Sequence, residues 1–159
     1  MQRSAGILLY RYDDSALLVL LAHPGGPFWK NRDDGAWSIP KGLIEPEETA
    51  EAAARREFHE EIGIEALGAL APLGTIRQRG GKYVEAFALE GEFDPAMLRS
   101  NPFELEWPPR SGRIHVYPEV DRAAWMDLAL ARTKMLESQQ PLLDRLEAHL
   151  AGRSPTTAK

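Results

Sequence analysis

Three glutamates, Glu57, Glu60 and Glu61, lie within one short stretch beside Arg56. Side chains three and four positions apart share one side of a helix, where like charges weaken the helix by about a few tenths of a kcal/mol per pair. Carboxylate oxygens are the ligands that hard divalent cations such as magnesium prefer, and a bound cation would offset this repulsion. The spacing therefore indicates a candidate metal site. The alternative is a solvated helix face on which Arg56 pairs with Glu60.

A helix must position these acids, and its expected limits are readable in the sequence. Thr49 is a residue type that caps helix starts, and Gly63 is the type that ends helices. Apolar residues recur every four positions between them, which predicts a stripe that packs on a sheet while the acids face away from it. That stripe consists of Ala50, Ala54, Phe58 and Ile62.

The whole stretch from Gly42 to Ile64 resembles the signature of the Nudix hydrolase family at every fixed position. The polar and glycine positions of the signature are filled by Gly42, Glu48, Arg56, Glu57, Glu60, Glu61 and Gly63, and its two apolar positions by Phe58 and Ile64. The resemblance extends to "WSIPKG" before this stretch and to "PEVDRAAWMDLALAR" near the end, so it covers most of the chain.

The resemblance implies a Nudix α/β/α sandwich, a mixed α/β fold whose catalytic loop–helix–loop is the stretch from Gly42 to Ile64. It also implies hydrolysis of a diphosphate linkage in a nucleoside diphosphate joined to another group. Magnesium is the expected cofactor, and manganese is expected to substitute for it. By similarity the metal ligands are Glu57, Glu60, Glu61 and the backbone carbonyl of Gly42, and the braces of the loop–helix–loop are Glu48 and Arg56.

The expected reaction is attack of a metal-activated water on phosphorus. A carboxylate would take the proton from that water, and the signature does not fix which one. Within the stretch, Glu57 and Glu60 are candidates. Later in the chain, some relatives use a loop glutamate, for which the candidates are Glu104, Glu106 and Glu119.

Candidate substrate-binding residues lie outside the helix. Lys41 directly precedes the signature, where it could meet a phosphate, and Arg77, Arg79 and Lys82 form the densest basic group, around a glycine turn. Trp29, in a loop rich in Gly and Pro, could stack on a base. For all of these the plainer alternatives are a solvated turn or an aromatic ring at the edge of the core.

"WSIPKGLIEPEE" resembles the branch that holds dinucleoside polyphosphate hydrolases and nucleotide-pool-cleaning enzymes. We therefore expect a dinucleoside polyphosphate such as diadenosine tetraphosphate, ahead of a mononucleoside triphosphate. Tyr83 lies near the position of a tyrosine common in the first group, although strand alternation would place Ala86 there instead. A nucleotide-sensing domain without hydrolysis is a further alternative, and the complete set of acids favours an enzyme over it.

Composition excludes or disfavours several kinds of site and several classes of protein. The chain has 159 residues, a formal net charge of −5 and no cysteine, which excludes disulfides and thiolate metal sites. The negative charge disfavours binding of a nucleic-acid polymer, and the apolar runs are too short for a membrane span. We expect a cytoplasmic monomer or homodimer with a single domain over residues 1–151 and a mobile tail over residues 152–159.

The apolar runs and the turn residues between them predict a hairpin of strands at residues 4–12 and 16–23, followed by a long loop around a short strand at residues 37–39. Two more strands are expected on either side of Gly80 and Gly81. An irregular segment at residues 101–111 then leads to a strand at residues 112–120. Asp121 or Asp127 caps a helix that runs to about Met135, and a last helix spans residues 141–150.

Overall fold

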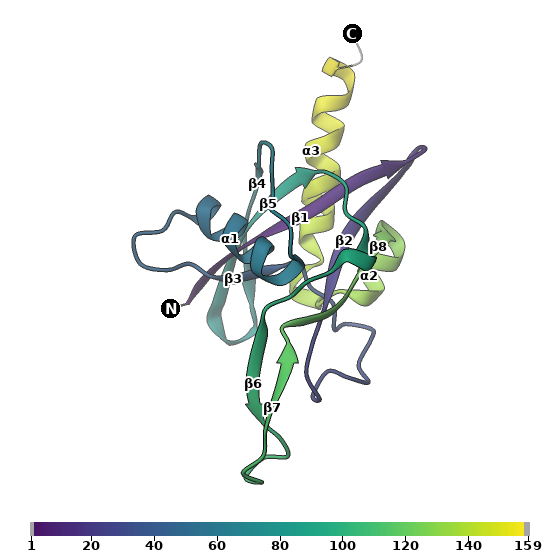
Figure 1. The fold of residues 1–159 in the computed structure, drawn as a ribbon. Helices are drawn as coiled ribbons and strands as arrows, with labels where there is room; N and C mark the ends of the chain where they lie inside the picture. The colour runs from purple at the N-terminus through teal and green to yellow at the C-terminus, as the bar shows by residue number, and fades with distance from the viewer. Residues whose placement is uncertain (1, 158–159) are drawn as a thin grey trace.

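A mixed sheet forms the centre of the molecule in the computed structural model, which describes residues 2–157 (Figure 1). The strand order is β4-β5-β1-β2-β8, with the short β3 paired to β1. The pairing of β1 with β5 is parallel and all the other pairings are antiparallel, which confirms the mixed α/β class. The sheet strands are β1 (Arg3–Asp13), β2 (Ala16–Pro24), β3 (Lys41–Leu43), β4 (Ala71–Gln78), β5 (Lys82–Glu90) and β8 (Val120–Asp127).

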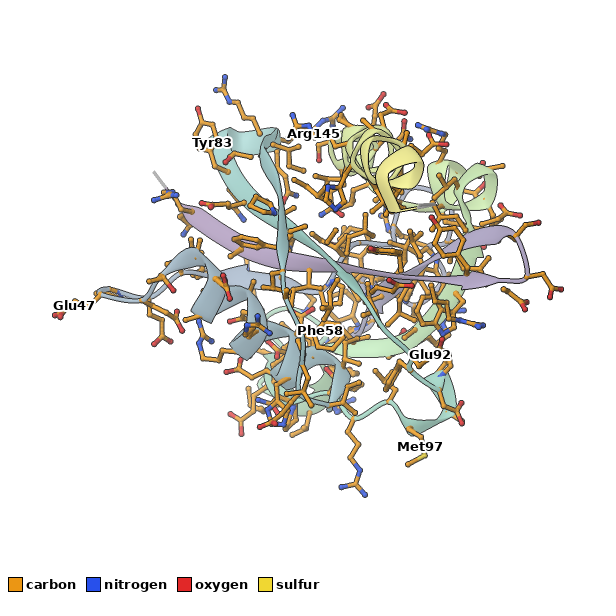
Figure 2. The ribbon with its side chains drawn as sticks, turned by 90° about the horizontal axis from the view of Figure 1, so that it is seen from above. Glu47, Phe58, Tyr83, Glu92, Met97 and Arg145 are labelled. Carbon is orange, nitrogen blue, oxygen red and sulfur yellow. The ribbon has the colours of Figure 1, made fainter. Side chains whose placement is uncertain are left out.

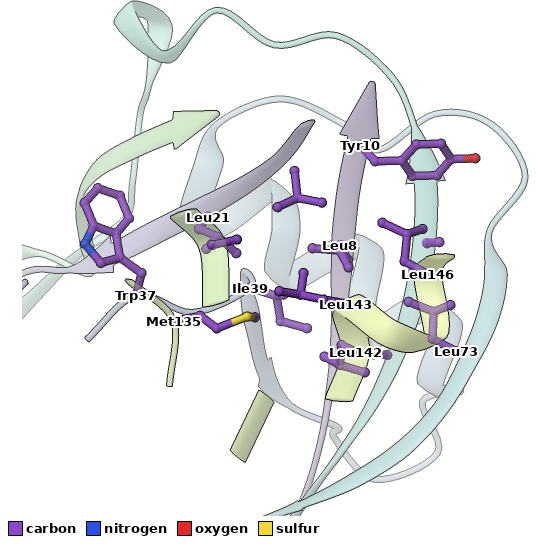
Figure 3. Close-up of a cluster of buried hydrophobic side chains, with 14 of the residues drawn as sticks. Leu8, Tyr10, Leu21, Trp37, Ile39, Leu73, Met135, Leu142, Leu143 and Leu146 are labelled. Atoms are coloured by element: carbon purple, nitrogen blue, oxygen red, sulfur yellow. The ribbon is translucent and has the colours of Figure 1, made fainter. Parts of the chain in front are cut away.

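Helices cover both faces of this sheet, because its central strands are apolar on both sides. On β1, Ile7 and Leu9 face α1 (Ala50–Ile62), whereas Leu8 and Tyr10 belong to the cluster of buried side chains that includes α3 (Pro141–Thr157). The latter cluster also holds Met135, beyond the end of α2 (Leu128–Lys134) (Figure 3). Figure 2 shows α1 and α3 on opposite sides of β1, so the predicted α/β/α sandwich is confirmed.

The limits of α1 agree with the sequence prediction. Thr49 Oγ1 accepts a hydrogen bond from the N–H of Ala52 at 3.1 Å, and Gly63 ends the helix in the left-handed conformation at φ 101°. Phe58 is the main anchor on the sheet, and only 1% of its surface is exposed. Ala53 is buried as well, so the apolar stripe is wider than predicted.

The part of the chain that connects β5 to β8 forms a two-stranded ribbon, which projects from the sandwich (Figure 1). It consists of β6 (Pro102–Glu106) and β7 (Ile114–Pro118), paired antiparallel. The prediction of an irregular segment at residues 101–111 is therefore wrong for residues 102–106. The strand predicted at residues 112–120 contains β7 and the first residue of β8, which pairs along β2 as far as Asp127.

The C-terminal part corrects two further details. Asp127, and not Asp121, caps α2: its Oδ1 accepts from the N–H of Leu130 at 2.8 Å. The last helix, predicted at residues 141–150, continues to Thr157. The mobility of the tail at residues 152–159 stays a prediction, and residues 158–159 lie outside the described residues. The described residues also contain three single-turn helices: Arg79–Gly81, Pro95–Met97 and Glu137–Gln139. No helix in the described part of the chain has the length and apolar character needed to cross a membrane.

Candidate active site

Arg56 braces the loop–helix–loop by holding three carboxylates at once. Its Nε and Nη2 donate to the two oxygens of Glu48 at 2.8 and 2.9 Å, a bidentate pairing. Nη1 donates to Glu57 at 2.7 Å and to Glu60 at 3.1 Å, and Nη2 also donates to the carbonyl of Leu43 at 2.9 Å. The Arg56 guanidinium holds the pKa of Glu48 at about 2. The loop that precedes α1 is thereby tied to the side of the helix that carries the acids.

Gly42 and Glu57 explain why this loop begins with a glycine. A side-chain carbon at position 42 would collide with the carboxylate of Glu57, which occupies that space. Burial raises the pKa of Glu57, against the lowering effect of its hydrogen bond from Arg56, and repulsion from Glu60 adds to the increase. The backbone of Gly42 and the carboxylate of Glu57 thus share one small space.

Glu61 lies deeper than its neighbours. Its Oε1 is 3.4 Å from the backbone N–H of Lys41 at the start of β3. Burial raises the pKa of Glu61 to about 8; the positive charge of Lys41 opposes the increase, and repulsion from Glu57 and Glu119 adds to it. A largely desolvated carboxylate with acidic neighbours and one nearby lysine is a site where a cation would bind favourably.

Glu119 reaches this cluster from a different part of the chain. The carbonyl of Glu60 accepts from the N–H of Asn101 at 2.8 Å, and the carbonyl of Asn101 accepts from the N–H of Glu119 at 2.9 Å. These two bonds fix Glu119, in the connection between β7 and β8, beside the end of α1. Partial desolvation at the cavity wall raises the pKa of Glu119, although the residue as a whole is exposed, and repulsion from Glu57 and Glu60 raises it further.

A cavity of about 420 Å³ opens beside this cluster. Its wall combines the acids Glu61 and Glu119 with the cation Lys41 and the aromatic ring of Phe103. The remaining lining residues are Ala22, Pro24, Gly25, Ser38, Ile39 and Val120. An apolar cavity with a few charged groups on one part of its wall is typical of small-molecule sites.

Strand alternation separates the three later glutamates. Phe103 lines the cavity, so Glu104, its neighbour in β6, points to the opposite face of the ribbon, and so does Glu106. Glu106 also accepts a hydrogen bond from the N–H of Gly112 at 2.8 Å, which stabilises the ribbon's turn. Of the three, only Glu119 lines the cavity.

The donor set fits a hard divalent cation. Among residues 2–157 no three acidic or histidine side chains converge as a preformed metal cage, and Glu57 and Glu60 are instead held by Arg56. Magnesium does not need such a cage, because it typically takes one or two carboxylates and keeps several waters. Carboxylates whose pKa is raised by burial and mutual repulsion supply the oxygen ligands and the negative charge that it requires.

The other predicted substrate-binding residues lie apart from the cavity. Lys41 lines it, whereas Arg77, Arg79 and Lys82 lie where β4 turns into β5 and are not part of its wall. Trp29 packs against the core cluster on the α3 side of the sheet, the plainer alternative for this ring. Roles in substrate binding for these four residues stay predictions.

Two residues that shape the cavity were not predicted from the sequence. Phe103 had a signal, the alternation in "PFELE", but the surrounding prolines favoured an irregular segment. Gln139 had none. Its buried amide accepts from the N–H of Ile39 at 3.0 Å and donates to Ser38 Oγ at 3.0 Å, so it holds two cavity-lining residues in place.

Comparison with known proteins agrees with this geometry. The family model described as the NUDIX domain matches residues 1–146, a range that contains α1, β3 and the cavity. The chain belongs to the Nudix family. The stretch from Gly42 to Ile64 is thus its Nudix box, and the resemblance noted in the sequence is confirmed.

Solved structures share the fold of this Nudix domain at low sequence identity. An Ap4A hydrolase from C. elegans, in a binary complex, has a TM-score of 0.65 at 23% identity, covering 94% of this chain and 98% of that chain. The NUDIX domain of Shewanella oneidensis NrtR, complexed with ADP ribose, has a TM-score of 0.63 at 18% identity, with 93% and 87% covered.

Among curated proteins, an RNA pyrophosphohydrolase of Pseudomonas putida strain F1 is 41% identical over 49 residues. The match covers 30% of this chain and 31% of that protein. The chain therefore aligns with about a third of the length of this relative.

Proposed function

We propose that this Nudix domain hydrolyses a diphosphate linkage in a nucleoside polyphosphate, with magnesium as its cofactor. One observation carries the proposal: Lys41, Glu61 and Glu119 line the same cavity as the aromatic ring of Phe103. The lysine can bind a phosphate, the glutamates can bind the metal ion, and the aromatic ring can stack on the base of the nucleotide. Manganese is the expected substitute for magnesium.

Each residue of the site has a role in this proposal. Glu57, Glu60 and Glu61 hold the metal, together with the carbonyl of Gly42, and Arg56 with Glu48 keeps these ligands in place. When bound, the metal supplies charge neutralisation at phosphate and a water of lowered pKa. Lys41 contacts a phosphate oxygen. Glu119 takes the proton from the attacking water, because it lines the cavity and its raised pKa suits a general base.

The favoured substrate is a dinucleoside polyphosphate such as diadenosine tetraphosphate. The shared fold with the C. elegans Ap4A hydrolase supports this choice. A mononucleoside triphosphate is the second candidate. The curated relatives named RNA pyrophosphohydrolases also cleave at a diphosphate linkage by their name, so the 5′ end of RNA belongs in the test. Binding of a nucleotide without hydrolysis is the non-catalytic alternative.

The test is a product screen with magnesium that compares the wild type with Glu61→Gln. The panel holds dinucleoside polyphosphates, nucleoside triphosphates, ADP-ribose, nucleotide sugars and a 5′-triphosphorylated RNA oligonucleotide, with products identified by mass. We expect hydrolysis of diadenosine tetraphosphate by the wild type, at least about 100-fold slower in the variant. Excess chelator should abolish the activity and added magnesium should restore it.

Two results would contradict the proposal. Equal activity of Glu61→Gln and wild type would remove Glu61 from the metal site. No turnover of any panel member by a folded protein that still binds magnesium and a nucleotide would replace the enzyme by a nucleotide-binding domain.

A further inference from the structure

The β6–β7 ribbon carries an aromatic face that starts at the cavity. Phe103 and Tyr117 are directly paired across the two strands, as are Leu105 and His115, so these four side chains share one face. The ring centroids of Phe103 and Tyr117 are 6.0 Å apart, and those of Tyr117 and His115 are 6.2 Å apart. We call these four residues the aromatic face. Phe103 lines the cavity, so the face leads from the cavity outward along the ribbon.

The size of the cavity leaves part of a dinucleoside substrate outside it. Ligand pockets span about 300–1,000 Å³, and the volume here, about 420 Å³, lies near the lower end of that range. Such a volume takes one nucleoside with its nearest phosphates. The second nucleoside of a dinucleoside polyphosphate must then lie on a surface that continues from the cavity, and the aromatic face is such a surface.

The charges of the ribbon identify the chemistry of its occupant. The two strands carry the carboxylates Glu104 and Glu106 and no lysine or arginine, and the two arginines of the ribbon, Arg110 and Arg113, lie in the turn at its tip. A strand pair of this composition does not attract a phosphate backbone, whereas aromatic rings stack on any neutral base. In a dinucleoside polyphosphate all the phosphates lie between the two nucleosides, so they stay near Lys41 and the metal ligands while an uncharged nucleoside reaches the ribbon.

We infer that the aromatic face of the β6–β7 ribbon binds the second nucleoside of a dinucleoside polyphosphate, with Tyr117 and His115 stacking on its base. Phe103 contacts the first nucleoside at the cavity. This inference rests on the proposed function, because it assumes a substrate with two nucleosides. It assigns to the ribbon the choice between dinucleoside and mononucleoside substrates.

The test measures binding, so it does not depend on turnover. Calorimetry with magnesium compares analogues of diadenosine tetraphosphate and of adenosine triphosphate in which a methylene group replaces every oxygen that bridges two phosphorus atoms, so that neither analogue is hydrolysed. Tyr117→Ala should weaken binding of the dinucleoside analogue about 5- to 100-fold, because one base-stacking ring is lost. Its binding of the mononucleotide analogue should be unchanged. His115→Ala, farther from the cavity, should show the same selectivity even if Tyr117→Ala unfolds.

Two control variants show whether stacking is the cause. Tyr117→Phe keeps the ring and should bind both analogues like the wild type. Val116→Ala alters the opposite face of the same strand, where Val116 is 63% exposed, and should also leave both affinities unchanged.

Several outcomes would overturn the inference. Equal loss of affinity for both analogues in Tyr117→Ala and His115→Ala would make the face a support of the cavity, and no loss in either variant would make it irrelevant to binding. A 5′-triphosphorylated RNA oligonucleotide that bound more tightly than the dinucleoside analogue, and depended on Tyr117, would assign the ribbon to a polynucleotide. The proposed function fails separately, if the wild type hydrolyses no member of the product screen.

Discussion

The carboxylate of Glu57 occupies the space that a side chain at position 42 would need. The first residue of the Nudix box and a glutamate in the second turn of α1 are therefore matched in shape. A glycine is required at position 42 because of this close approach, even though its backbone conformation is accessible to other residues.

Gly42→Ala should consequently displace Glu57. We expect a loss of about 1–3 kcal/mol in the free energy of unfolding from overpacking, and a fall in kcat/KM of about 100-fold from a displaced ligand. Gly152→Ala is the matched control, since nothing lies within 4 Å of the added carbon in α3, and it should stabilise the protein slightly. Urea unfolding and initial rates measure both effects, and an active Gly42→Ala protein would contradict the geometry.

Arg56→Ala should remove the brace between the loop and α1. Hydrogen bonds to charged groups contribute about 1.5–3 kcal/mol, and the bidentate pairing with Glu48 is only partly exposed, so we expect a loss of about 2 kcal/mol together with a lower kcat. Arg132→Ala breaks a more exposed pairing with Asp144 and should cost less than about 1 kcal/mol. Equal melting temperatures for the two variants would argue against bracing by Arg56.

The raised pKa of Glu61 gives the metal-free protein a defined pH dependence. The folded state keeps a proton on this carboxyl up to about pH 8, whereas the unfolded chain releases it near the ordinary value of 4.5. The stability contributed by Glu61 is therefore fully present below pH 4.5 and is lost as the pH rises through about 8.

With chelator present, the melting temperature of the wild type should fall as the pH is raised from 5 to 8. Glu61→Gln should flatten this dependence, because glutamine releases no proton. The slope that Glu61 adds is of the order of 1 kcal/mol per pH unit, and each kcal/mol corresponds to about 2–4 °C in a domain of this size. Identical pH profiles for the two proteins would show that Glu61 titrates normally.

Glu119→Gln should lower kcat by about 100- to 10,000-fold if Glu119 takes the proton from the attacking water. Glu104→Gln, in the same region of the chain but on the opposite face of the ribbon, should leave kcat unchanged. The rates are measured at saturating magnesium with diadenosine tetraphosphate. A low kcat in Glu104→Gln and an unchanged kcat in Glu119→Gln would assign the proton transfer to Glu104 instead.

Local patterns in the sequence were sufficient to predict α1 and the placement of its acids on one side of the helix. The cap at Thr49, the glycine end and the spacing of the glutamates are all set within one short segment, so no long-range contact is needed to read them. The hairpin of β1 and β2 was predictable for the same reason, because two apolar strands flank a short turn.

Features that depend on contacts between distant parts of the chain could not be predicted from local sequence patterns. Glu104, Glu106 and Glu119 were equivalent candidates until the position of Asn101 against the end of α1 placed Glu119 at the cavity. Asp121 is a good capping residue in isolation, yet it lies in β8 between two residues that pair with β2, at a register shift, and its carboxylate contacts buried His23 at 2.8 Å instead. Strand pairing overrides local capping preference here.

The parallel pairing of β1 with β5 joins Arg3 to Tyr83, residues far apart in the chain. During synthesis the β1–β2 hairpin can form early, but the centre of the sheet closes only after β5 has emerged, and the acidic cluster is completed later still, by Glu119. Contacts of such long sequence separation slow folding because a large loop must close first. We expect catalytic activity to return with the slowest refolding phase, after the helical signal of α1 has recovered.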